Sequence, residues 1–312
     1  MNFLKIKGGI MEKYNRFYTL KEQLKTNPMT IGISTQMDML IERYGEEYIA
    51  ISENLLKIME DLGYNIFEQA KHYMVDYIKG MMKFLQKGTY SNGTYDEIQQ
   101  SVYDNEDKMI NIYLPGLLLA HAVTILVYTK CHLFFNDFLP KIKKGAKGVD
   151  VGFGEGFYML EILENIEDSI CYGFDISNHS LKFAPKIFEK AGIIKERYIL
   201  NIGDIRSSLP IEDNSLDYAV IAEVVEHIDN PENALKELSR VLKKDGILFL
   251  STVKDSNHMD HITNFPSSEY VENMIQNEGF EITAKSIQRN QDDFPESKDI
   301  SVGLAYVCKK IK

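Results

Sequence analysis

The alternation of short β-rich runs with amphipathic helical segments after residue 140 constrains the fold more than any other feature of this sequence. The β-rich runs cover residues 148–151, 170–174, 198–201, 217–222 and 247–252. Helical patterns separate them at residues 157–166, 181–191 and 232–242. This alternation predicts a mostly parallel α/β sheet with helices on both faces. Ligands of such sheets bind beyond the carboxyl ends of the strands, so the functional site is predicted at that edge.

The first 140 residues have a different period. Their apolar side chains recur at three- and four-residue spacing, which predicts helices over residues 37–59, 67–85 and 115–139. The third predicted helix opens close to a proline and ends before another. We therefore predict an all-α accessory domain at residues 1–140 and a separate α/β domain at residues 141–312.

The charge balance limits the class of partner. The chain carries 46 acidic and 35 basic residues, a formal net charge of −11, and both halves are acidic. Neither half is suited to neutralising a phosphate backbone, so nucleic acid is not expected as a partner. A neutral or cationic small molecule or peptide fits better.

The cysteines and the apolar segments indicate the cellular compartment in which the protein is expected. The three cysteines form no CxxC motif, which excludes a cysteine-rich zinc site and a disulfide framework. Residues 113–129 are apolar but interrupted, and shorter than the roughly 18–20 clean apolar residues that a membrane span needs. The N-terminus has no signal-peptide pattern. We expect a soluble, cytoplasmic protein without a membrane partner.

A glycine-rich loop follows the first strand of the α/β half. It reads VDVGFGEGF and contains Asp150, Gly152, Gly154 and Gly156 before a helix that starts near Phe157. Such glycines allow a sharp turn and close approach of a ligand, and the helix directs N–H groups into the same crevice. A nicotinamide fingerprint GxGxxG needs a third glycine where Phe157 stands, so a nicotinamide-dependent oxidoreductase is disfavoured.

Each of the next two strands ends near an acidic residue. Asp175 lies at the tip of the second strand, 25 residues after Asp150, where a carboxylate can accept the hydroxyls of a ribose. Asp204 follows the third strand, within reach of an adenine amino group. Either acid alone is more often a solvated loop residue, but successive strand ends converge on one crevice.

These segments together resemble the class I S-adenosylmethionine-dependent methyltransferases. The resemblance covers about residues 145–255 and rests on VDVGFGEG, CYGFDIS and GDIRSSLPIEDNSLDYAVIAEVVEHI in order. It implies a Rossmann-like, mostly parallel seven-stranded sheet and S-adenosyl-L-methionine as cofactor, with S-adenosyl-L-homocysteine as product. It does not cover residues 1–140 and says little about the methyl acceptor.

The resemblance also implies roles for individual residues. Gly152 and Gly154 would approach the methionine part of the cofactor, with Asp150 supporting the loop that ends at Gly156. Asp175 would hold the ribose. The remaining cofactor-side positions are Ile176 against the adenine, Asp204 and Ile205 at the adenine edge, and Glu223 facing the methionine moiety or the acceptor.

Histidines are the candidate catalytic bases, because an alcohol or ammonium acceptor must lose a proton near neutral pH. His227 stands in the family-typical EHI, where hydrogen bonding at a helix start is the competing interpretation. His121 lies in the apolar third helix, where it is either a satisfied core residue or part of a roof over the pocket.

The segment NHMDHITNF after the fifth strand holds His258 and His261 around Asp260. Three interpretations stay open: a metal site, capping of a helix that begins near residue 266, or a wall of the acceptor pocket that binds or deprotonates the acceptor. Short clusters of this kind are common in loops, and we predict no bound metal. We expect a pocket wall.

The predicted function is O-methylation of a hydroxyl or carboxylate on a natural product or modified peptide. The helical half would cover the acceptor site, form a homodimer interface, or both. N-methylation of a small-molecule amine is the nearest alternative. A non-catalytic partner that retains the cofactor fold is an alternative from another class, disfavoured by the intact glycine loop and both acids.

Overall fold

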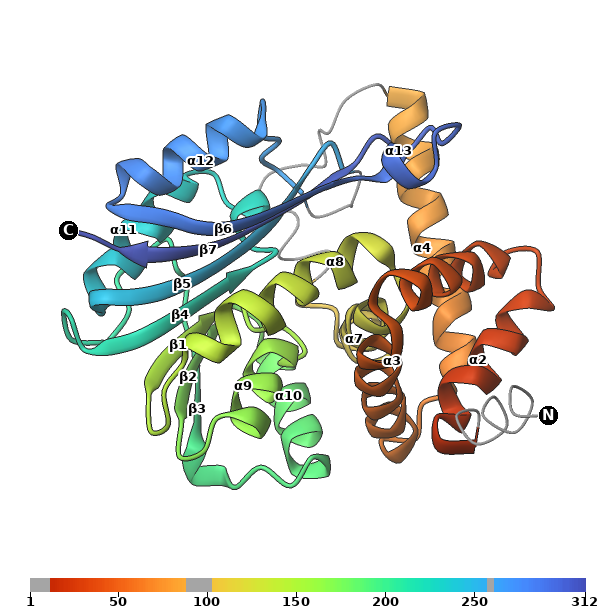
Figure 1. Ribbon diagram of the computed structural model, residues 1–312, viewed down its shortest axis with the longest axis horizontal. Coiled ribbons are helices and arrows are strands. Elements are labelled where there is room, and N and C mark those ends of the chain that lie inside the picture. The colour runs from red at the N-terminus through yellow and green to blue at the C-terminus, as the bar shows by residue number, and fades with distance from the viewer. Residues whose placement is uncertain (1–11, 88–102, 257–260) are drawn as a thin grey trace.

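The computed structural model describes residues 12–87, 103–256 and 261–312 and contains a seven-stranded sheet on one side, beside the helices of the first part of the chain (Figure 1). The strands are β1 (Lys147–Val151), β2 (Ile170–Asp175), β3 (Tyr198–Ile202), β4 (Leu216–Ala222), β5 (Leu242–Lys254), β6 (Phe280–Arg289) and β7 (Val302–Lys310). Their order is β3-β2-β1-β4-β5-β7-β6. Strands β1 to β5 are parallel, and β7 runs antiparallel to both β5 and β6. The predicted mostly parallel sheet is confirmed, and its strand order reverses direction between β1 and β4.

Helices cover both faces of the sheet. On one face lie α9 (Phe157–Asn165) and α10 (Asn178–Lys190), and on the other lie α11 (Pro231–Val241) and α12 (Ser268–Asn277) (Figure 1). The short elements of this half are η5 (Lys195–Arg197), η6 (Val225–His227) and α13 (Asn290–Asp293). The predicted helices between the strands are present within a few residues of their expected bounds.

The first part of the chain is helical, as predicted. Its helices are α2 (Asn15–Lys25), α3 (Ile31–Asp61), α4 (Ile66–Lys87), α6 (Glu106–Lys108), η2 (Met109–Tyr113), α7 (Leu114–Val123), α8 (Ile125–Leu133), η3 (Phe134–Phe138) and η4 (Leu139–Lys141). Helix α2 was not predicted, although its buried Phe17, Leu20 and Leu24 follow helical spacing.

The prediction of one continuous helix over residues 115–139 was wrong. Thr124 adopts an extended conformation (φ −115°, ψ 135°), and the segments on either side of it are bent by 74°. The break allows α7 to pack on α3 and α8 to pack on β7, so both halves of an apolar run are buried. Tertiary packing, rather than a proline or glycine, sets this bend.

A helix that crosses a membrane must be both long enough and apolar enough. No single helix among the described residues meets both conditions, and one bent pair, Glu106–Val123 with Ile125–Lys141, meets them together.

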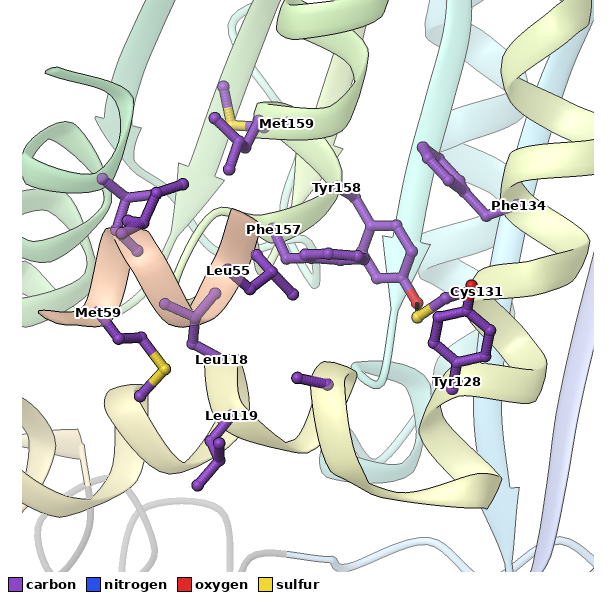
Figure 2. Packing of buried hydrophobic residues seen from close by; sticks show 14 of the residues in the cluster. Leu55, Met59, Leu118, Leu119, Tyr128, Cys131, Phe134, Phe157, Tyr158 and Met159 are labelled. Carbon is purple, nitrogen blue, oxygen red and sulfur yellow. Dashed lines mark hydrogen bonds between the residues drawn. The ribbon is translucent and has the colours of Figure 1, made fainter. Parts of the chain in front are cut away.

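The hydrophobic core is continuous between the helical half and one face of the sheet. Leu55 of α3 and Leu118 of α7 point toward Phe157 of α9 (Figure 2). The rings of Phe134 and Phe249 pack edge to face with centroids 5.2 Å apart, which joins η3 to β5. The helices before the sheet are therefore packed against it and held beside its carboxyl edge.

Candidate functional site

The glycine loop after β1 requires its glycines for different physical reasons. Gly152, Gly154 and Gly156 have φ values of +67°, +52° and +89°, which non-glycine residues rarely adopt. A Cβ on Gly152 would lie 2.4 Å from Val224 Cγ2, and one on Gly156 would lie 2.8 Å from Phe188 Cζ. A Cβ on Gly154 would meet only a backbone oxygen at 4.0 Å. Gly152 and Gly156 are thus fixed by packing, whereas Gly154 leaves open space on the side where a ligand would approach.

Asp175 ties the glycine loop to the end of β2. Its Oδ2 accepts the Gly154 N–H at 2.9 Å and its Oδ1 accepts the Ser177 N–H at 2.8 Å. Burial raises the pKa of Asp175 to about 6, although both backbone N–H groups act to lower it. An ionised carboxylate has about four lone-pair sites. Together with the side-chain hydrogen bond from Ser180, these bonds use three of the four sites and leave acceptor capacity for a ligand hydroxyl.

Asp150 and Asp204 border the same crevice, but the pKa values of their carboxyl groups are shifted in opposite directions. Asp150 is 2% exposed, and burial together with the charges of Glu155 and Asp175 raises the pKa of its carboxyl well above the usual value. Asp204 is partly exposed and bonded to Arg206 Nη2 at 2.7 Å; burial raises its pKa, but Arg206 outweighs burial and the net shift is downward. Asp150 thus suits a supporting role, and Asp204 can present a charged acceptor.

These acids line one cavity of about 350 Å³, which lies within the usual range for small-molecule sites. Its walls come from the glycine loop, the ends of β2 to β5, and the helices α4, α7 and α8. Ile176, Ile205 and Glu223 border it, as do His121, His227 and His261. Among the predicted site residues, Gly156 belongs to the glycine loop but does not line the cavity. His258 and Asp260 lie outside the described residues.

An ion pair between a buried lysine and a partly exposed glutamate joins the helical half to the end of β4. Lys130 Nζ of α8 lies 2.6 Å from Glu223 Oε2, and Ser251 Oγ donates to Glu223 Oε1 at 2.8 Å. Burial acts to raise the pKa of Glu223, but Lys130 outweighs it and the pKa is lowered. Glu223 is therefore an ionised, oriented carboxylate, held with φ at +54°.

His121 has partners on both ring nitrogens. Its Nε2 lies 2.9 Å from Glu155 Oε1 in the glycine loop, and its Nδ1 lies 3.2 Å from Cys131 Sγ. The ring stacks on Phe157 with centroids 3.8 Å apart. Burial lowers the pKa of His121, but Cys131 and Glu155 outweigh it and raise the pKa to about 10. A protonated imidazole cannot accept a proton, so this geometry favours a positioning role over a base.

His227 and His261 lie next to each other in the cavity wall. Their rings pack edge to face with centroids 4.9 Å apart, and both border the cavity. His261 Nδ1 lies 3.1 Å from the Ser256 carbonyl oxygen. Helix α12 is capped by Ser267, whose hydroxyl accepts the Tyr270 N–H at 3.2 Å. His261 is thus placed in the pocket wall, and the capping role belongs to another residue.

Part of this chain matches a known family of domains. Residues 149–250 match the model of a family described as "Methyltransferase domain". That span contains the glycine loop, Asp175, Asp204 and Glu223. The chain contains a class I S-adenosylmethionine-dependent methyltransferase domain.

Curated relatives of the methyltransferase domain match only part of this chain. The probable methyltransferase ltbC of Aspergillus luteorubrus is 34% identical over 116 residues, 35% of this chain and 41% of that protein. The ubiquinone biosynthesis O-methyltransferase of Chromobacterium violaceum is 26% identical over 131 residues, 42% of this chain and 54% of that protein. This chain thus spans about half the length of these relatives or less.

Solved structures share the fold of the methyltransferase domain. A geranyl diphosphate methyltransferase in complex with GPP and sinefungin superposes with a TM-score of 0.51, covering 64% of this chain and 82% of that one at 14% identity. A putative sarcosine dimethylglycine methyltransferase from Galdieria sulphuraria gives a TM-score of 0.50, covering 62% and 87% at 13% identity. At these identities the likeness bears on the fold alone.

The methyltransferase domain uses S-adenosylmethionine as cofactor, and the geometry fits that group. The space beside Gly154 and the remaining acceptor capacity of Asp175 suit a nucleoside-bearing ligand. Ile176 and Ile205 supply apolar surface on the same side, next to Asp204. We propose that these residues hold the ribose and adenine parts.

Several residues of the methyltransferase site were missed by the sequence analysis. Lys130 and Glu155 were not singled out, although each pairs with a candidate residue across the cavity. A lysine within an apolar helix was the available signal for Lys130. Glu226 was passed over as part of EVVEH, yet it is fully buried, and burial and the neighbouring Glu223 raise its pKa to about 7.

Proposed function

We propose that this protein is an S-adenosylmethionine-dependent O-methyltransferase that modifies a hydroxyl group of a natural product or modified peptide. The observation that carries the proposal is the shared cavity, because cofactor-side residues and helical-half residues line the same space. In this proposal the helices α4, α7 and α8 shape the acceptor pocket and keep water out of it.

When bound, the cofactor supplies a methyl group that passes to the acceptor oxygen, while the S–C electron pair stays on sulfur and the hydroxyl proton is released. The protein's residues then have to bind, orient and exclude water. Asp175 binds the ribose, and the paired Lys130 and Glu223 fix the end of β4 beside the reacting groups. His227 and His261 border the space in which an acceptor proton must be removed.

The charge of the cavity favours a hydroxyl over a carboxylate acceptor. Its described lining contains seven Asp and Glu residues, of which Asp150 has a raised pKa, against two lysines and the protonated His121, so acidic groups remain in excess. Lys130 is already paired with Glu223. An anionic acceptor would be repelled by such a surface, whereas a neutral hydroxyl would not. Four tyrosines of the helical half add aromatic surface to the cavity wall: Tyr73, Tyr77, Tyr103 and Tyr113.

The same acidic lining favours one second candidate, N-methylation of a small-molecule amine. Asp76 and Asp299 lie at the part of the cavity bordered by α4, and Tyr77 donates to Asp299 at 2.6 Å. These carboxylates would attract an ammonium group. The position of methylation on a product distinguishes the two candidates.

The experiment measures binding first and transfer second. Calorimetry with the full chain should give binding of S-adenosylhomocysteine and none of NADH; NADH binding without S-adenosylhomocysteine binding overturns the proposal. Transfer from radiolabelled S-adenosylmethionine is then measured with catechol, phenol, benzoate and tyramine. We expect label on phenolic oxygen, and label confined to the amine of tyramine supports the second candidate instead.

A further inference from the structure

Two histidines of the cavity wall form a cluster with a buried glutamate. Glu226 and His227 belong to η6, directly after β4, and His261 lies 34 residues further along the chain. The Glu226 carbonyl oxygen accepts the N–H groups of Ile262 and Thr263 at 3.0 and 2.9 Å. These bonds fix the segment that carries His261 against η6. One ligand atom from each of Glu226, His227 and His261 lies within 4.8 Å of the others.

The Glu226 carboxylate is hydrogen-bonded through only one of its two oxygens among the described residues. The residue is fully buried, and its Oε2 accepts the Thr252 hydroxyl at 2.8 Å. Its Oε1 is also buried and has no hydrogen-bond partner among the described residues. Leaving a buried carboxylate oxygen unpaired destabilises the folded protein. A bound cation would remove that cost.

A hydrogen bond of His261 determines which of its ring nitrogens can bind a cation. A carbonyl oxygen only accepts, so the contact of Nδ1 with the Ser256 oxygen places a hydrogen on Nδ1. In the neutral ring the lone pair is then on Nε2. Metal-binding histidines usually have one ring nitrogen bonded to a carbonyl or carboxylate in this manner, with the other on the metal. Ser256 therefore serves as the orienting partner.

We propose that Glu226, His227 and His261 bind one divalent transition-metal ion at the acceptor side of the cavity. Two imidazoles and one carboxylate suit Zn²⁺, Mn²⁺, Fe²⁺ or Co²⁺, whereas Mg²⁺ and Ca²⁺ prefer oxygen ligands. The sequence alone groups His261 only with its chain neighbours, so no metal was predicted there. The fold places His261 instead with two residues of EVVEH.

The position of the cluster indicates what the ion does, and this step rests on the proposed function. His227 and His261 line the same cavity as Glu223 and the glycine loop. Three protein ligands leave coordination positions for oxygens of an acceptor. A hydroxyl bound there would have a lowered pKa and a fixed orientation. The acceptor class is then an alcohol or phenol, best with a second oxygen on the neighbouring carbon.

Binding of Co²⁺ to the full chain tests the site without any acceptor. The protein is prepared without a histidine tag, treated with a chelator, and titrated with CoCl₂ by calorimetry and visible absorption. We expect one ion per chain and ligand-field absorption bands. Glu226→Gln, His227→Ala and His261→Ala should each weaken Co²⁺ binding by more than about tenfold, because loss of an outer-shell partner alone costs about 10–100-fold. His72→Ala is the matched control, because His72 is exposed on α4, and it should bind Co²⁺ as the native chain does.

The outcomes separate this proposal from the proposed function. Absence of Co²⁺ binding by the native chain, or equal binding by His261→Ala, overturns the metal site. S-adenosylhomocysteine affinity is measured for every variant and should change less than twofold in His261→Ala. A native chain that binds S-adenosylhomocysteine and transfers methyl groups but binds no Co²⁺ contradicts only the metal proposal. A chain that binds Co²⁺ but no S-adenosylhomocysteine contradicts the proposed function alone.

Discussion

Lys130 Nζ lies 2.6 Å from Glu223 Oε2, and this contact connects residues 93 positions apart in the sequence. It joins α8 to the strand end where the cofactor and acceptor spaces meet. Lys130 is almost fully buried, so its charge depends on Glu223 for compensation. Three further pairs, Asp175 with Gly154, His121 with Glu155, and His227 with His261, complete the cavity from separate elements.

Replacing Lys130 by methionine should destabilise the protein by about 1–3 kcal/mol, because Glu223 keeps its charge and loses its counter-ion. The Glu223 side chain is 38% exposed, which places the expected loss below that of a fully buried pair. Urea unfolding measures the change in the free energy of unfolding. Adding Glu223→Gln to this variant should restore part of the loss, and strict additivity of the two substitutions would contradict the coupling.

Asp175→Asn should weaken S-adenosylhomocysteine binding at least about tenfold, because the amide presents one acceptor oxygen in place of two. The variant also loses an acceptor for the N–H of Gly154 or Ser177, so a modest fall in stability accompanies it. Calorimetry gives the affinity and circular dichroism the melting temperature. Native-like affinity would show that Asp175 does not hold the ribose.

Cofactor affinity should fall as the pH is lowered through about 6, the raised pKa of Asp175. Protonation removes the charge that accepts the ribose hydroxyls. Folding stability should respond in the opposite direction: the folded state holds a proton that the unfolded state has released, so the contribution of Asp175 is largest below the unfolded pKa and is lost as pH rises through about 6. Calorimetry with S-adenosylhomocysteine from pH 5 to 8 tests the first effect. A flat profile would argue against an ionised Asp175 in binding.

Gly154→Ala should reduce cofactor affinity strongly while lowering stability only by the backbone strain, about 1–2 kcal/mol. Its added methyl group meets open space on the cavity side. Gly192→Ala is the matched control, since Gly192 has a φ of +79° with nothing within 4 Å and lies outside the cavity lining. The two variants should unfold alike and differ in S-adenosylhomocysteine binding. Equal affinities would refute the assignment of Gly154 to the cofactor.

His121 should stay protonated through pH 8, given its raised pKa of about 10. Nuclear magnetic resonance of the imidazole C–H and N–H signals measures its titration directly. Glu155→Gln should bring the pKa down, because it removes the charge that Nε2 contacts. Titration of His121 near its ordinary value in the native chain would reopen its role as a base.

The sequence by itself determined the sheet, the glycine loop and the acids at successive strand ends. These follow from local periodicity and from the rule that parallel strand ends converge on one edge. Asp150, Asp175 and Asp204 could therefore be grouped before any contact was known. Helix α2 carried the same kind of signal in Phe17, Leu20 and Leu24 and could have been predicted.

Only the tertiary structure decided the bend at Thr124 and the partners of Lys130, His121 and Glu226. The bend depends on what α7 and α8 pack against, because all the residues around Thr124 are compatible with a helix. The partners lie between 10 and 93 positions away along the chain, from the pair of His121 with Cys131 to the pair of Lys130 with Glu223. A local sequence pattern does not indicate which residues from separate elements of the chain will come into contact. A carboxylate and two histidines become one cluster only when β4, η6 and the segment after β5 are packed side by side.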